Sequence, residues 1–233
     1  MSKYFMVLDT ETAGDVNKRS TLRVYDFGWV VTNTKGEPMT RKSFVIDEVF
    51  TNDELMGSAY YADKLPRYRE GLTYGKWVSK SFIEARAAFL ADMVQYRCTE
   101  VYAYNCRFDE GALNATMRSL SNGYTDAFVP KSVEWRDIWG YAQDTICATP
   151  QYVRWAVDNG ALTPTGRIST TAEAVYRYLT KDSAFIEAHT AADDAAIESY
   201  ILHRARHMPR KGSFEWHGAK TKVLNSIRKE LGI

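Results

Sequence analysis

The stretch FMVLDTETAG (residues 5–14) places two carboxylates directly behind a run of apolar side chains. The apolar run from Tyr4 to Leu8 predicts a buried central strand. Side chains two positions apart in a strand point to the same face, so Asp9 and Glu11 are expected side by side where this strand ends. Two like charges at that distance repel each other unless a cation lies between them. The pattern fits either a solvated strand end or a site for a divalent metal ion.

The residues after this strand predict an antiparallel meander of three strands. Residues 22–34 are rich in β-branched and aromatic side chains, and the sequence KGEP at residues 35–38 signals a turn. Residues 41–50 are then expected to form the returning strand.

Beyond the meander, helices alternate with short strands. Helical periodicity or capping signals predict helices at residues 52–65, 79–97, 108–120, 170–179 and 190–207. The first of these is expected to end before Pro66, and Thr170 with Glu173 has the spacing of a capping box. Short strands are predicted at residues 100–105 and 132–139. This order predicts an α/β fold with a mixed central sheet flanked by helices, and no linker marks a domain boundary.

Composition excludes several classes of protein. The chain has 233 residues and a formal net charge of +1, so binding to nucleic acid would need a local basic patch. Cys98, Cys106 and Cys147 lack CxxC spacing, which argues against a disulfide framework or a zinc site and favours a reducing environment. The sequence has no secretory signal and no stretch typical of a membrane span. We therefore expect a cytoplasmic protein without a membrane partner.

The C-terminal end, residues 204–233, is more basic than the rest of the chain. Its basic residues are Arg204, Arg206, Arg210, Lys211, Lys220, Lys222, Arg228 and Lys229. Phe214 and Trp216 are interleaved with them, and such a mixture is typical of a groove for single-stranded nucleic acid. The alternative is a solvated helix with one charged face.

Acidic residues stand at an element boundary in two further stretches. Asp109 follows the predicted strand at residues 100–105, and His189 precedes Asp194 by five positions where a helix begins. Each stretch alone has an ordinary explanation as a surface turn or a helix cap. Their occurrence together, in this order and at these boundaries, favours one shared site.

The chain resembles the DEDDh group of 3′-to-5′ exonucleases, the DnaQ-like family, which includes small phage exonucleases. The family's first motif, a strand ending in D-x-E, is matched by VLDTETAG at residues 7–14. Its second motif, N-x-x-F-D, is matched by residues 105–109, and its third, H-x-A-x-x-D-A, by residues 189–195. Gly28 also falls where the family has a glycine, whereas Tyr104 stands where the family often has a histidine.

This resemblance implies a ribonuclease H-like fold, with an antiparallel three-strand meander followed by parallel strands. It implies an exonuclease domain at residues 1–203, followed by the basic extension at residues 204–233, packed on or trailing that domain. Asp9, Glu11, Asp109 and Asp194 would hold two Mg²⁺ or Mn²⁺ ions, which prefer oxygen ligands. His189 would act as the general base, because an imidazole titrates near neutral pH.

The motifs also suggest residues that contact substrate. The five-residue interval from His189 selects Asp194 as the ligand rather than Asp193, which a helix turns away by about 100°. Four residues are candidates for substrate binding: Thr12, Ala13, Asn105 and Phe108. Asn105 has the alternative role of tying down its loop, and Phe108 that of a core residue. Tyr60, Tyr61 and Trp77 are either stacking partners for a terminal base or core residues.

The sequence thus predicts a metal-dependent 3′-to-5′ exonuclease that releases 5′-mononucleotides from single-stranded DNA. One alternative is an exoribonuclease that trims RNA or degrades short oligoribonucleotides. Another is a module that binds nucleic acid or a polymerase without cutting. A binding module has no need for four carboxylates and a histidine together, so we favour the enzyme.

Overall fold

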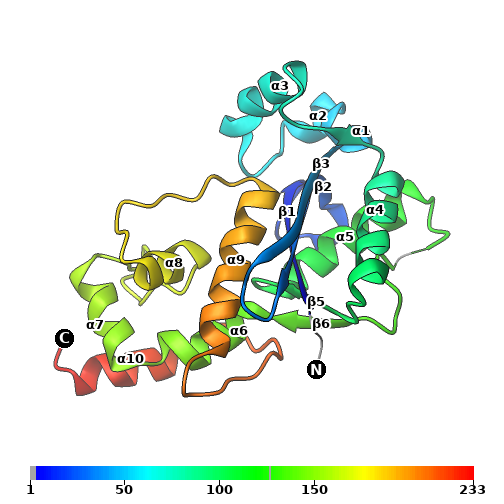
Figure 1. The fold of residues 1–233 in the computed structure, drawn as a ribbon. Helices are drawn as coiled ribbons and strands as arrows, with labels where there is room; N and C mark the ends of the chain where they lie inside the picture. Colours follow the sequence, from blue (N-terminus) through cyan, green and yellow to red (C-terminus); the bar gives the residue numbers. More distant parts are fainter. Residues whose placement is uncertain (1–3, 126) are drawn as a thin grey trace.

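The computed structural model describes residues 4–125 and 127–233 and is built around a mixed β-sheet (Figure 1). Within those residues the sheet has six strands in the order β4-β3-β2-β1-β5-β6. The strands are β1 (Tyr4–Ala13), β2 (Arg23–Asn33), β3 (Pro38–Ile46), β4 (Ser79–Lys80), β5 (Glu100–Ala103) and β6 (Glu134–Asp137). The first three pair antiparallel, β5 and β6 run parallel to β1, and β4 runs parallel to β3. This arrangement confirms the predicted meander followed by parallel strands.

Helices cover both faces of the sheet. They are α1 (Asp47–Phe50), α2 (Asp53–Met56), α3 (Leu65–Thr73), α4 (Phe82–Tyr96), α5 (Cys106–Leu120), α6 (Ile138–Ala142), α7 (Pro150–Asp158), α8 (Ala172–Thr180), α9 (Ala191–Arg206) and α10 (Thr221–Glu230). Short 3₁₀ turns are η1 (Arg19–Thr21) and η2 (Ala62–Lys64), and η3 (Gln143–Cys147) is a π-helical turn. Helix α9 lies on one face, and α4 and α5 lie on the other (Figure 1). No helix among the described residues is long and apolar enough to traverse a lipid bilayer.

The alternation of side chains along β1 decides which layer the carboxylates face. Met6 and Leu8 belong to the core that β1 shares with α4 and α5. Phe5 and Val7 belong to the core that it shares with α9. Because Asp9 and Glu11 continue the odd-numbered face, both are directed toward α9.

The start of α9 is held close to the sheet at β2. A Cβ atom on Gly28 would lie 2.3 Å from the backbone nitrogen of Ala192, so only glycine allows α9 to approach here. On the same face of β2, Asp26 Oδ2 accepts a hydrogen bond from the backbone nitrogen of Ala191 at 3.0 Å. Gly28 pairs with Asp9 in the sheet, so the beginning of α9 lies beside the β1 carboxylates.

The meander differs from the sequence prediction at two boundaries. β1 does not end at Leu8 but continues to Ala13, because its pairing with β2 persists past both carboxylates. The returning strand begins at Pro38 and ends at Ile46, and the next four residues form α1. Acidic side chains in the first turn of α1, Asp47 and Glu48, favour a helix start here.

Several predicted helix boundaries are also wrong. The helix expected from residue 79 begins at Phe82, because residues 79 and 80 form β4 and Ser81 caps the helix. The expected helix at residues 52–65 is broken into α2 and η2, and Pro66 lies in the first turn of α3 instead of stopping a helix. Proline fits a first turn because it has no backbone N–H to satisfy there. The cap of α8 is Thr171 rather than Thr170, and its hydroxyl accepts a hydrogen bond from the backbone nitrogen of Ala174.

Candidate active site

A cavity of about 380 Å³, which we call the acidic cavity, opens beside β1 and the start of α9. Most of the site residues predicted from the sequence line it: Asp9, Glu11, Thr12, Asn105, Phe108, Asp109, His189 and Asp194. They come from β1, from the start of α5, and from the first turn of α9 with the segment that leads into it. Ala13 does not line the cavity, because it is fully buried and its backbone pairs with Ala59.

The carboxylates of β1 lie in a repulsive environment. Burial, followed by repulsion from Glu198, Asp109 and Asp194, raises the pKa of Asp9 well above its ordinary range. Glu11 is only 5% exposed, and burial with repulsion from Asp194 raises its pKa to about 9. Without a cation these side chains are therefore driven to hold protons at neutral pH.

Asp109 reaches the acidic cavity from the other layer of the molecule. It lies in the first turn of α5 and is 2% exposed. Thr10 Oγ1 donates a hydrogen bond to Asp109 Oδ1 at 2.8 Å. Burial raises the pKa of Asp109 to about 7, and the hydrogen bond from Thr10 opposes that rise. Thr10, between the two acids of the first motif, thus fixes the carboxylate of the second motif.

His189 and Asp194 approach from the α9 side. His189 Nδ1 lies 3.7 Å from Asp194 Oδ2, and its ring stacks on Tyr61 with centroids 4.1 Å apart and planes 15° apart. Burial raises the pKa of Asp194, and His189 opposes that rise. The other oxygen of Asp194, Oδ1, is buried and has no hydrogen-bond partner among the described residues. A buried carboxylate oxygen without a hydrogen-bond donor has its lone pairs free to ligate a cation.

Asp193 is turned away from the acidic cavity. Thr190 Oγ1 donates a hydrogen bond to Asp193 Oδ2 at 2.6 Å, and Arg41 forms an ion pair with Oδ1. The hydrogen bonds from both partners lower the pKa of Asp193, against the effect of its partial burial. Of the two adjacent acids, Asp194 faces the other carboxylates.

Sequence reasoning missed two further acids in the cavity. Glu198 lies one turn after Asp194 on α9, is 4% exposed, and accepts a hydrogen bond from the backbone nitrogen of Tyr104 at 3.1 Å. Burial raises the pKa of Glu187 to about 7, and its Oε2 lies 4.0 Å from His189 Nδ1. The four-residue spacing from Asp194 to Glu198, on one helix face, is the signal that points to Glu198.

The donor set fits a divalent cation. Glu11, His189 and Asp194 each offer a ligand atom, and these atoms all lie within 4.8 Å of one another. Asp9 and Asp109 line the same cavity, so oxygen donors predominate. Carboxylate oxygens are the ligands that Mg²⁺ and Mn²⁺ prefer.

The remaining predicted residues have mixed roles. Asn105 adopts a left-handed backbone conformation with φ 66°, and its Oδ1 accepts a hydrogen bond from Trp216 Nε1 at 2.7 Å. Phe108 lines the cavity and also packs against the core. Tyr61 stacks on His189, whereas Trp77 packs on Tyr68 with ring centroids 4.3 Å apart.

Neither a protein-family model nor a curated protein sequence matches the chain. Its fold is similar to that of E. coli exonuclease I in complex with a dA16 oligonucleotide (TM-score 0.57, 15% identity), over 96% of this chain and 42% of that one. A 3′-exonuclease solved for its 3′-end-specific recognition of a histone mRNA stem-loop is also similar (TM-score 0.53, 14% identity), over 87% of this chain and 63% of that one. The chain therefore spans less than two thirds of either protein. This structural similarity confirms the predicted ribonuclease H-like fold.

Proposed function

We propose that the chain is a metal-dependent 3′-to-5′ exonuclease that releases 5′-mononucleotides from single-stranded DNA. The observation that carries this proposal is the meeting of Asp9, Glu11, Asp109, Asp194 and His189 around the acidic cavity. Three separate stretches of sequence supply these groups. The fold that positions them is shared with an exonuclease solved with a DNA oligonucleotide.

The four carboxylates would hold two Mg²⁺ or Mn²⁺ ions. Bound there, such ions offset the carboxylate repulsion, make a water molecule nucleophilic and stabilise the 3′-oxygen as it leaves. Thr10 keeps Asp109 directed at the cavity through its 2.8 Å hydrogen bond. The backbone contacts at Gly28 keep the start of α9, and with it Asp194, against β1.

His189 takes the proton from the attacking water. Its Nδ1 lies 3.7 Å from Asp194 Oδ2 and 4.0 Å from Glu187 Oε2, so the imidazole is held beside the carboxylates that would bind the metal ions. Stacking on Tyr61 limits rotation of the imidazole. Lys64 Nζ donates to the backbone oxygen of Ala188 at 3.3 Å and holds the same segment.

RNA is the second candidate substrate, because a 3′-exonuclease of the same fold recognises the 3′ end of a histone mRNA stem-loop. Discrimination between RNA and DNA depends on contacts to the 2′-hydroxyl. Cleavage of end-labelled single-stranded DNA, duplex DNA and RNA, with Mg²⁺, with Mn²⁺ or with EDTA, tests both the activity and the preference. We expect metal-dependent release of mononucleotides, fastest from single-stranded DNA.

Two neighbouring acids provide a matched pair of variants. Asp194→Asn should abolish cleavage, whereas Asp193→Asn, which alters only the contacts with Thr190 and Arg41, should retain it. Asp9→Ala should also abolish cleavage while the far-UV circular dichroism stays unchanged. Wild-type rates in Asp9→Ala or in Asp194→Asn would contradict the proposed function.

A further inference from the structure

A neighbouring cavity of about 620 Å³, which we call the threonine cavity, adjoins the acidic cavity. The two cavities share Tyr61, Tyr104, Asn105 and Ala172 in their linings. Tyr104 forms part of the boundary, and its hydroxyl donates to the backbone oxygen of Thr170 at 2.6 Å. The two cavities therefore border each other along the four residues that they share.

The threonine cavity has the opposite chemistry to the acidic cavity. Among the described residues that line it there is no Asp or Glu, and its serine and threonine side chains are Thr163, Thr165, Ser169, Thr170, Thr171 and Thr221. Thr170 Oγ1 accepts a hydrogen bond from Trp139 Nε1 at 2.9 Å, so its own hydrogen is left to donate. Hydroxyl donors without carboxylates suit the anionic backbone of a nucleic acid.

Arg167 adds a cation to this lining. It is exposed, and within residues 4–125 and 127–233 its guanidinium has no ion pair or hydrogen bond. An unpaired guanidinium beside hydroxyl groups is a strong partner for a phosphate, because it offers several donors in one plane.

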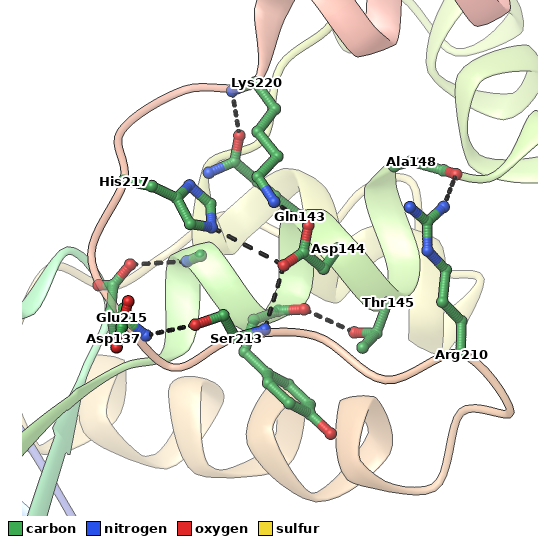
Figure 2. A network of polar contacts seen from close by, with 12 residues as sticks. Asp137, Gln143, Asp144, Thr145, Ala148, Arg210, Ser213, Glu215, His217 and Lys220 are labelled. Carbon is green, nitrogen blue, oxygen red and sulfur yellow. Dashed lines mark hydrogen bonds and ion pairs between the residues drawn. The ribbon is translucent and has the colours of Figure 1, made fainter.

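The C-terminal segment, residues 207–220, contributes a wall of the threonine cavity through Ala219. Asp144 of η3 holds this segment by an ion pair with Lys220 and by a 3.1 Å hydrogen bond from the backbone nitrogen of Ser213 (Figure 2). Gln143 Oε1 accepts a hydrogen bond from the backbone nitrogen of Lys220 at 2.7 Å. The segment is therefore fixed against η3.

Trp216 connects the same segment to the second motif. Its Nε1 donates to Asn105 Oδ1 at 2.7 Å, and the guanidinium of Arg107 lies 4.3 Å from the centre of its ring. Asn105 is the residue that precedes α5, which carries Asp109. The C-terminal segment thus contacts both the threonine cavity and the loop that leads to Asp109.

We propose that the threonine cavity binds the phosphates of nucleotides on the 5′ side of the scissile bond, with the C-terminal segment as one of its walls. This inference rests on the proposed function and gives the C-terminal segment a structural role as a wall of the site. The threonine cavity has a volume of about 620 Å³, which is in the range of ligand pockets. It therefore has room for at least one nucleotide besides the one in the acidic cavity. We call this binding site for the upstream phosphates the track. Because its contacts are to phosphates and to Trp139, rather than to base edges, the track should bind DNA of any sequence.

Two substrates distinguish binding in the track from binding of the 3′-terminal nucleotide in the acidic cavity. The p-nitrophenyl ester of thymidine 5′-monophosphate occupies only the terminal position, because nitrophenolate replaces the leaving 3′-oxygen. A long oligo-dT occupies both cavities. We expect Arg167→Ala to raise KM for oligo-dT by about tenfold, the effect of losing one charged hydrogen bond. Hydrolysis of the ester should stay within about twofold of the unaltered protein.

Matched variants complete the test. Arg154→Ala removes an exposed arginine on α7, outside both cavities, and should leave both substrates unaffected. Asp144→Ala removes the ion pair with Lys220 and the hydrogen bond from the backbone nitrogen of Ser213, which loosens the C-terminal segment, and should raise KM for oligo-dT. Fluorescence anisotropy of labelled oligo-dT on Asp194→Asn protein, with and without Arg167→Ala, gives a readout that needs no cleavage.

The outcomes are distinguishable. If the unaltered protein cleaves neither substrate, the proposed function fails, and anisotropy still tests the track. If the ester is cleaved and Arg167→Ala binds and degrades oligo-dT like the unaltered protein, the proposal for the track is wrong, whereas the proposed exonuclease function is retained. Equal weakening by Arg154→Ala and Arg167→Ala would also overturn it, because the effect would then be general surface charge.

Discussion

Replacing Glu11 by glutamine should make the metal-free protein more stable while abolishing its activity. Glu11 is 5% exposed, and burial and the neighbouring carboxylates raise its pKa from 4.5 to about 9. The folded protein therefore binds more protons than the unfolded chain between about pH 4.5 and pH 9. The free energy of unfolding of the metal-free protein is therefore highest below this pH window and falls as the pH rises through it. Gln has nearly the same shape and does not ionise.

The size of the effect follows from the pKa difference. At about pH 8, Glu11 stays protonated in the folded, metal-free protein but is ionised in the unfolded chain, and taking up that proton costs on the order of 5 kcal/mol. We expect Glu11→Gln to recover about 2–5 kcal/mol of this, the lower figure applying if neighbouring carboxylates relax when the charge is gone. Near pH 5 most of the cost is absent, so the two proteins should differ by about 1 kcal/mol or less.

Urea unfolding followed by circular dichroism, in EDTA at about pH 5 and about pH 8, measures both differences. Added Mg²⁺ should stabilise the unaltered protein at pH 8 and should stabilise Glu11→Gln much less, because a ligand is missing. Equal stability of the two proteins at pH 8, or a stability of the unaltered protein that does not fall between the two pH values, would refute the reasoning.

Three other substitutions test the framework of the site. Gly28→Ala places a Cβ 2.3 Å from the backbone nitrogen of Ala192 and should cost about 1–3 kcal/mol in urea unfolding; an unchanged midpoint would show that α9 is not packed on β2 as described. His189→Ala should lower the cleavage rate by about 10²–10⁴-fold while Mn²⁺ still raises the melting temperature, and an unchanged rate would remove it as the base. Tyr68→Phe removes the 2.6 Å hydrogen bond to buried Asp26 and should cost about 1–3 kcal/mol, so a loss below a few tenths would contradict that contact.

Local patterns were enough to predict five of the six described strands and the motif residues that line the cavity, whereas β4 (Ser79–Lys80) lies where a helix was expected. The two-residue period of β1 places Asp9 and Glu11 on one face, and the short spacing within each motif places Asp109 and Asp194 at helix starts. Where the prediction was wrong, pairing between strands overrode the local signal: β1 continues past its apolar run to Ala13 because β2 continues beside it.

Contacts between distant segments could not be predicted in the same way. The hydrogen bond from Tyr104 to Glu198 joins residues 94 positions apart, and the ion pair between Asp144 and Lys220 joins residues 76 apart. No periodicity within either segment encodes such a contact. The composition of the C-terminal end suggested a groove, whereas the anchor at Asp144 that fixes it is visible only in the fold.

Anomalous diffraction from crystals soaked in Mn²⁺ tests the central claim most directly. The account predicts two peaks in the acidic cavity, about 3.5–4 Å apart, with oxygens of Asp9, Glu11, Asp109 and Asp194 as ligands and the His189 ring beside them. A cavity without manganese, or ions bound by other side chains while these carboxylates stay unligated, would contradict it.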